Sequence, residues 1–150
     1  MLKALVAIDG SDHSLAAVRH VIKLVSEREP LDIHLLNVQA PLHGDVTAFV
    51  GAGAVRDWHR DEGEKALADA CAVLDAVGIA YRKHVAVGHA AQAIAQWAKE
   101  LACDKVIMGT RGLGAMSQLL LGSVSHEAIH HMDAAIPVTL VKRPPTAQRS

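Results

Sequence analysis

Short apolar segments alternate with segments of helical periodicity along this chain, and this alternation restricts the fold more than any other feature of the sequence. The apolar segments span residues 2–8, 33–38, 81–87, 105–108 and 136–141. Between them, apolar residues recur three or four positions apart, as they do in amphipathic helices. A helix between two strands returns the chain to the same end of a sheet, so the strands run parallel. The sequence therefore predicts an α/β fold with a five-stranded parallel sheet.

The polarity of the strands predicts their order. The first, second and fourth segments are almost continuously apolar, which is typical of strands inside a sheet. The third and fifth carry polar residues at alternate positions, such as Arg82, His84 and Thr139, as edge strands do. The order 3-2-1-4-5 satisfies both patterns and gives a three-layer α/β/α, Rossmann-like arrangement. Ligands bind such sheets where the strand order changes direction, so Asp9 and Gly109, at the ends of strands one and four, should face one crevice.

Helix signals occur between these strands. Ser11 is predicted to cap the first helix. Residues 39–55 contain much Gly and Ala without a clear period, and we expect a long loop there. From about Arg56 a helix is expected, with Gly78 as the residue after its end. The apolar residues expected to face inward from that helix are Leu67, Ala70, Leu74 and Val77.

Length and composition exclude several classes of protein. A chain of 150 residues is consistent with a single domain over 1–150. Its formal net charge of −1 gives no electrostatic footprint for nucleic acid or for an anionic membrane. There is no signal-peptide layout, and no apolar stretch approaches the length of a membrane span. Cys71 and Cys103 form no CxxC pair and are expected to be reduced thiols. We therefore expect a cytoplasmic protein.

The most informative segment contains Gly109, Gly112, Gly122 and Ser123 in the pattern Gly-x2-Gly-x9-Gly-Ser. It is not a P-loop, because no Gly-Lys-Ser/Thr follows, and its glycines do not fall as the Rossmann GxGxxG. Glycines permit close approach and positive-φ turns. A helix that begins at Gly122-Ser123 offers unpaired N–H groups and its dipole to an anion. The pattern predicts a phosphate site, and a simple turn before a helix start remains the alternative.

The chain resembles the universal stress protein family over nearly its whole length. The resemblance rests on residues 6–11 (VAIDGS), 104–114 and 137–141, and on the gap-free match of the glycine pattern to the ATP-binding motif of that family. It implies an adenine nucleotide alpha hydrolase-like fold and ATP binding. It also implies a homodimer formed through Ile136–Val141. The implied role is that of a nucleotide-dependent regulator or sensor in stress responses, acting on an unidentified client protein.

Carried over by position, the resemblance implies roles for ten residues. Asp9 would contact the ribose or an associated metal, and Val38 would hold the adenine through its backbone. Met108 and Gly109 would line the ribose side, and Arg111 would reach a phosphate. The phosphates would be surrounded by Gly112, Gly122, Ser123, Val124 and Ser125. Mg²⁺ or Mn²⁺ would be carried on the phosphates and not in a protein cage.

One position departs from the family. After the third strand the family commonly has an acidic residue following glycine, whereas here Gly88 precedes His89. An acidic residue favours the N-terminus of a helix, and a protonated histidine opposes its dipole. We expect a small effect on stability and no change of ligand.

A competing motif lies in the same region. Residues His126 to His130 spell HExxH, in which two histidines one helical turn apart could share zinc and Glu127 could act as general base. No third ligand is evident, because His131 points elsewhere around the helix. The five residues also fall in the helix that the phosphate motif needs. A metalloprotease is therefore the least favoured function.

ATP binding leaves more than one kind of function open. Fast hydrolysis needs a positioned water and charge compensation at the γ-phosphate. The motif offers no general base, and its one cation is Arg111. A binding module fits better, and slow hydrolysis or autophosphorylation on Ser123 or another hydroxyl is an alternative. A dimeric scaffold that binds no nucleotide is another.

Overall fold

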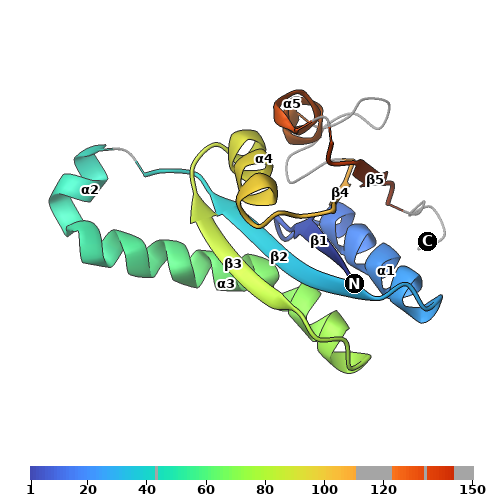
Figure 1. Ribbon diagram of the computed structural model, residues 1–150. Helices are drawn as coiled ribbons and strands as arrows, with labels where there is room; N and C mark the ends of the chain where they lie inside the picture. The colour runs from blue at the N-terminus through green and yellow to red at the C-terminus, as the bar shows by residue number, and fades with distance from the viewer. Residues whose placement is uncertain (43, 111–122, 134, 144–150) are drawn as a thin grey trace, which may run out of the picture.

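A computed structural model of the chain describes residues 1–42, 44–110, 123–133 and 135–143. Strands and helices alternate along it, with one additional helix after the second strand (Figure 1). The strands are β1 (Leu2–Ala7), β2 (Leu31–Gln39), β3 (Arg82–Val87), β4 (Lys105–Gly109) and β5 (Val138–Val141). The helices are α1 (Asp12–Ser26), α2 (Gly44–Val50), α3 (Ala52–Ala76), α4 (Ala90–Glu100) and α5 (Ser123–His131).

The strands form one parallel sheet in the order β3-β2-β1-β4-β5, which confirms the predicted topology. β1, β2 and β4 lie inside the sheet, and most of their side chains are buried. The register pairs Ala7 of β1 with Leu36 of β2, and Gly109 of β4 with Val141 of β5. The carboxyl ends of all strands therefore meet at one edge, where a ligand can reach the loops that follow them.

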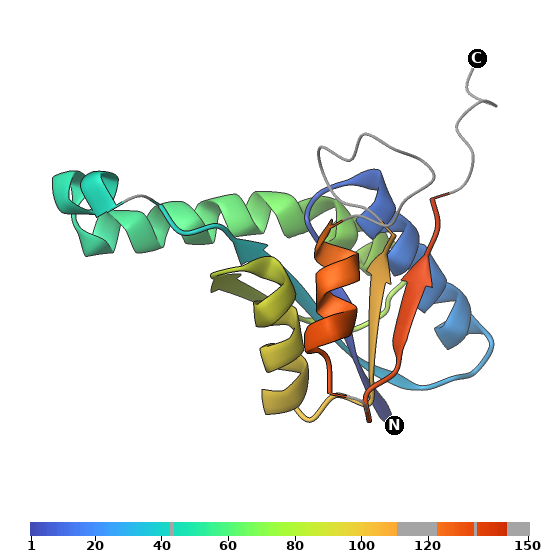
Figure 2. The same cartoon turned by 90° about the horizontal axis from the view of Figure 1, so that it is seen from above.

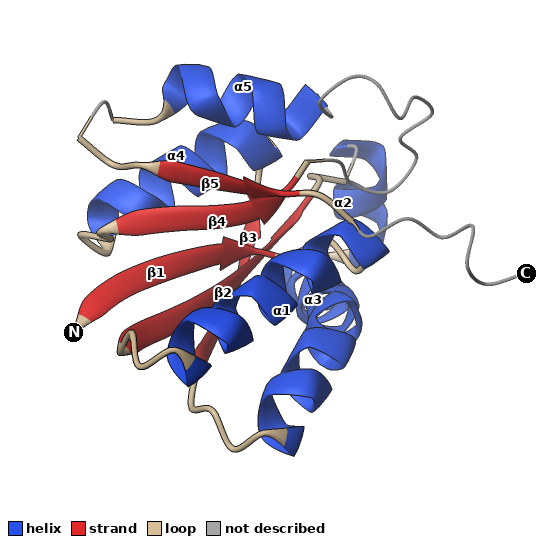
Figure 3. Ribbon diagram, turned by 90° about the vertical axis from the view of Figure 1, so that its right-hand side faces the viewer, coloured by secondary structure: helices blue, strands red, loops and turns tan. Residues whose placement is uncertain are grey.

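Helices cover both faces of the sheet, as Figure 3 shows. On one face α1 and α3 pack against residues such as Ile33 and Leu35. On the other, α4 and α5 lie side by side over Leu5, Leu36 and Val106 (Figure 2). Each fully buried side chain of this size contributes about 1.5–3 kcal/mol to folding. The expected three-layer α/β/α arrangement is thus observed.

The ends of two helices follow the sequence signals. The Oγ of Ser11 accepts a hydrogen bond from the N–H of Ser14 at 3.2 Å and caps α1 as predicted. Gly78 follows the end of α3 with a φ of +71°, a conformation that favours glycine. The prediction that Val77 faces inward is wrong, because this residue lies at the C-cap of α3 and is 53% exposed.

The prediction of a long loop over residues 39–55 is also wrong. β2 continues through Gln39, α2 occupies Gly44–Val50, and α3 begins at Ala52, four residues before the expected start. These two helices meet at Gly51, whose φ of +86° breaks the helical path. α2 buries none of its residues, so no apolar stripe marks it in the sequence. Together with the N-terminal half of α3 it forms an arm that projects from the sheet (Figure 1).

Within the described residues, no helix has both the length and the apolar character that a bilayer span requires.

Candidate functional site

A pocket opens at the carboxyl ends of β1 and β4, beside the point where the strand order changes direction. It has an empty volume of ≈ 480 Å³, which includes space open to solvent. Twelve residues line it, contributed by β1, β2, β4 and the starts of α1, α4 and α5: Ala7, Ile8, Asp9, Ser14, Leu36, Val38, Ala90, Ile94, Met108, Gly109, Val124 and Ser125. Six of the ten residues predicted for the site are among them. The crevice expected between Asp9 and Gly109 is therefore present.

Asp9 is held by the turn between β1 and α1. Its Oδ1 accepts a hydrogen bond from the N–H of Ser11 at 2.9 Å, and Gly10 between them has a φ of +88°. Glycine fits that conformation without strain. Asp9 is half-buried. Among the described residues that line the pocket, it alone has an ionisable side chain. The turn thus presents one carboxylate to an otherwise mostly apolar cavity.

Gly109 forms part of the pocket floor, but its closest neighbour is α1. A Cβ added there would lie 2.5 Å from the carbonyl oxygen of His13 and 2.7 Å from its carbonyl carbon. Both are backbone atoms, which cannot turn aside as a flexible side chain can. The sequence pattern explained this glycine by the approach of a ligand. In the structure, the packing of α1 against β4 already requires it.

α5 reaches the pocket through its first turn. Ser125 is buried, and its Oγ donates to the carbonyl oxygen of Gly109 at 2.8 Å. This bond ties the start of α5 to the end of β4 and uses the hydroxyl proton of Ser125. Val124 lines the pocket and is 38% exposed. Ser123 begins the helix.

The remaining predicted residues of the phosphate motif, Arg111, Gly112 and Gly122, lie outside the described residues.

Sequence reasoning missed several residues that line the pocket. Ser14 is buried, and its Oγ donates to the carbonyl oxygen of Ser11 at 2.9 Å. Leu36 neighbours Ala7 in the sheet register, and Ala90 and Ile94 come from the first turns of α4. The signal for α4 was present, because a helix after a parallel strand begins at the same edge of the sheet as the strand ends.

His89 stands at the N-cap of α4 and makes no side-chain capping hydrogen bond. The expected small effect of this residue on stability stays a prediction.

The HExxH histidines lie on α5. His126 and His130 are exposed, and their ring centroids are 4.8 Å apart in an edge-to-face arrangement. In the part of the chain that the structure describes, no three His, Cys, Asp or Glu side chains gather as a metal site. A zinc protease needs three protein ligands and an open position, so these two histidines give the metalloprotease hypothesis no further support.

Comparison with known proteins adds independent evidence. A family model described as the universal stress protein family matches residues 1–142. Universal stress protein MJ0531 of Methanocaldococcus jannaschii is 30% identical over 148 residues, which cover 95% of this chain and 82% of that protein.

Solved structures agree with this match. Hypothetical protein MJ0577 superposes with a TM-score of 0.79 at 25% identity, over 97% of this chain and 98% of that one. A universal stress protein family protein from Arabidopsis thaliana, solved with AMP bound, superposes with a TM-score of 0.69 at 21% identity, over 100% of this chain and 99% of that one. The topology, the matched length and the identity to a curated relative agree, and the chain belongs to the universal stress protein family.

Proposed function

We propose that the protein binds an adenine nucleotide, ATP carrying Mg²⁺ or Mn²⁺, and acts as a nucleotide-dependent regulator in stress responses. The observation that carries the proposal is the pocket between the ends of β1 and β4, beside the start of α5. Open α/β sheets bind nucleotides at such a change of direction. The start of a helix, where N–H groups lack backbone partners, suits an anion.

The lining of the pocket suits a flat, weakly polar base. Ile8, Leu36, Ile94 and Met108 supply apolar surface, and the carboxyl end of β2 contributes Val38. Small-molecule pockets combine an apolar lining with a few polar groups, and this pocket has that composition. A base held here would leave its sugar near Asp9.

Asp9 restricts where the phosphates can lie. A carboxylate repels phosphate, but it accepts hydrogen bonds from ribose hydroxyls or contacts a hydrated divalent cation. The described residues contain no cluster of three or more acidic, His or Cys side chains that could hold a metal. Mg²⁺ would therefore be held mainly by phosphate oxygens and water, with Asp9 as the nearby protein carboxylate.

The AMP bound in the Arabidopsis thaliana structure supports an adenine nucleotide as the ligand class. Mass spectrometry of small molecules released from the purified protein tests this directly. Thermal unfolding with Mg²⁺ and ATP, ADP, AMP or GTP then ranks the ligands, since a ligand specific for the native state raises apparent stability. No released nucleotide and no upward shift with any of the four would refute the proposal.

Asp9→Asn is the sharpest variant for this site. Asn keeps an oxygen that can accept the hydrogen bond from the N–H of Ser11, but it removes the charge. We expect affinity for Mg-ATP to fall about tenfold or more, because a hydrogen bond to a charged group contributes about 1.5–3 kcal/mol. Gly122→Val should abolish the binding of Mg-ATP, because it places a branched side chain at a glycine of the predicted phosphate motif. Asp45→Asn, on the exposed first turn of α2, is the matched control and should bind as the wild type does. Isothermal titration measures all three.

A homodimer formed through β5 is part of the same proposal. Within the described residues β5 pairs only with β4 and stands at the edge of the sheet. The N–H of Val106 donates to the carbonyl of Pro137, and that of Thr110 donates to the carbonyl of Val141. Backbone groups alternate in direction along a strand, so those of Val138 and Leu140 point away from β4. Unpaired groups of this kind invite a second strand, and a two-fold axis supplies one from another copy.

A further inference from the structure

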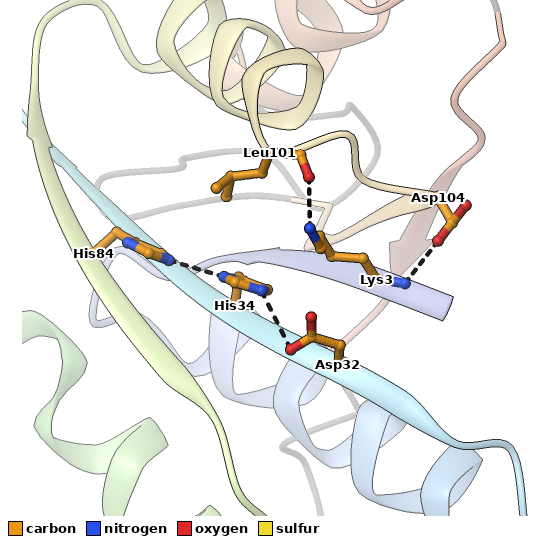
Figure 4. A network of polar contacts seen from close by, with 6 residues as sticks. All are labelled: Lys3, Asp32, His34, His84, Leu101 and Asp104. Carbon is orange, nitrogen blue, oxygen red and sulfur yellow. Dashed lines mark hydrogen bonds and ion pairs between the residues drawn. The ribbon is translucent and has the colours of Figure 1, made fainter. Parts of the chain in front are cut away.

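Two histidines on neighbouring strands share a hydrogen bond beneath α4. His34 of β2 is buried, and His84 of β3 is half-buried. Nδ1 of His34 lies 2.9 Å from Nε2 of His84, and the two rings are nearly parallel, with 6° between their planes (Figure 4). A hydrogen bond between two imidazole nitrogens contains one proton, so one ring donates and the other accepts.

Asp32 decides which ring donates. Its Oδ1 lies 3.3 Å from Nε2 of His34, a nitrogen that is shielded from solvent and lacks a partner in full hydrogen-bond geometry. A carboxylate at that distance favours an N–H over a lone pair, so His34 carries its proton on Nε2 and accepts at Nδ1. His84 therefore donates through Nε2. The next proton can bind only at Nδ1 of His84 unless the shared hydrogen bond breaks.

The charges around the pair balance one another. They come from β1, β2, β3 and the segment after α4: Lys3, Asp32, Arg82 and Asp104. Lys3 donates through Nζ to the carbonyl of Leu101, at the end of α4, and its N–H donates to Asp104. α4 itself contributes the Trp97 ring, 5.0 Å from that of His84, while its charged residues Lys99 and Glu100 are exposed. Within the described residues no carboxylate contacts His84, so nothing beside its ring offsets a positive charge there.

Acidic pH therefore disfavours the closed arrangement, in which the two histidines share their hydrogen bond beneath α4. Burial lowers the pKa of His84, and the neighbouring His34 and Arg82 lower it further. In an opened chain a histidine has a pKa of about 6.5. Between that value and the lower pKa of the closed form, the open form binds more protons, so stability present above about pH 6.5 is lost as the pH falls. If both rings were positively charged, Nδ1 of His34 and Nε2 of His84 would both carry protons and would face each other across 2.9 Å.

The pair is connected to the pocket through one face of α4. Ala90 and Ile94 line the pocket, and Trp97 contacts His84. These three residues are spaced four and three positions apart, so they lie on the same side of the helix. A movement of the C-terminal turns of α4 away from β3 would therefore displace its first turns from the pocket.

We propose that the His34–His84 hydrogen bond is an acid-sensitive latch that holds β3 and α4 on β2. Mildly acidic pH favours an opened arrangement in which His84 is solvated and protonated and the shared hydrogen bond is broken, and this loosens the edge of the sheet and opens the α4 wall of the pocket.

Hydrogen exchange of the nucleotide-free protein tests the latch without reference to any ligand. Protection factors are measured between about pH 7.5 and pH 5.5. Peptides of β3 and α4 should lose protection as the pH falls below about 6.5, by about tenfold per pH unit for each histidine that is protonated only on opening. Peptides of α1, which packs on β1 and β4 on the other face of the sheet, should keep theirs.

His84→Gln isolates the cause. Glutamine can still donate to Nδ1 of His34 but does not titrate, so protection of β3 and α4 should depend less steeply on pH than in the wild type. His131→Gln removes an exposed histidine of α5 and should behave as the wild type does. Equal loss of protection in the wild type and in His84→Gln would overturn the latch. If His84→Gln does not fold, the NMR titration of His84 in the wild type decides, and a midpoint at or above about 6.5 overturns it.

The link to the pocket rests on the proposed function and is measured separately. The affinity for Mg-ATP should fall more steeply with pH in the wild type than in His84→Gln, and the ratio between the two cancels protonation of the nucleotide itself. The same pH dependence in both proteins would contradict the coupling to the pocket. Failure of ATP to bind near neutral pH contradicts the proposed function alone, and hydrogen exchange then decides whether the latch exists.

Discussion

Gly109 illustrates how a single position can serve two neighbours at once. It faces the pocket, and it also lies against the carbonyl of His13 in α1. Gly109→Ala should lower the free energy of unfolding by about 1–3 kcal/mol, the usual cost of forcing extra volume into a packed site. Urea unfolding measures the change. A variant as stable as the wild type would show that α1 moves away from β4 without cost.

Residue-level features were predictable where the cause is local. The cap at Ser11 and the C′ glycine at Gly78 follow from neighbouring residues, and both were read correctly from the sequence. Ser125 was expected at the phosphates, but its bond to Gly109 spans 16 residues and becomes visible only when β4 and α5 are brought together. The clash between a Cβ at Gly109 and His13 is hidden in the same way. Local rules cannot supply distances between elements that are remote in the sequence.

Two glycines of α3 give a matched test at the level of secondary structure. A Cβ at Gly63 would lie 2.5 Å from both methyl groups of Val85 in β3, whereas a Cβ at Gly53 would have nothing within 4 Å. Alanine favours a helix over glycine by about 1 kcal/mol. Gly53→Ala should therefore raise the melting temperature, and Gly63→Ala should lower it because α3 must move off the sheet. An increase for both would show that β3 yields to α3 easily.

The helices α2 and α3 also show why one element was predicted wrongly. Hydrophobic periodicity reports which face of a helix is buried, and α2 has no buried face. Phe49 of α2 is 92% exposed, and Trp58 of α3 is 44% exposed. Large apolar residues on such an arm have no period to follow. The strands were predicted well for the opposite reason, because three of them are buried on both faces of the sheet.

At the scale of the whole molecule, the order of the strands and the place of the pocket could be derived from the sequence. Polar residues at alternate positions marked β3 and β5 as edges, and the switch between β1 and β4 located the crevice. The latch could not be derived in this way. His34 and His84 are 50 residues apart, and only the register of β2 with β3 brings them together. Topology follows from burial, whereas polar contacts depend on register.

The proposed dimer belongs to this scale as well. Val138→Pro should retain the fold, because proline is tolerated on an edge strand where its missing N–H would have faced outward. It should also block pairing of β5 with a second copy. Native mass spectrometry of the wild type should show a dimer and that of the variant a monomer, with unchanged circular dichroism as the check on folding. A dimer that persists in the variant would place the interface elsewhere.

The arm formed by α2 and the first half of α3 affects how such measurements are read. It extends away from the sheet (Figure 1), and its residues are largely exposed. A projecting rod increases friction with the solvent without adding much mass. On a gel-filtration column calibrated with rounded proteins, this chain would elute early and a monomer could be taken for a dimer. Light scattering, whose signal depends on mass and not on drag, separates the two.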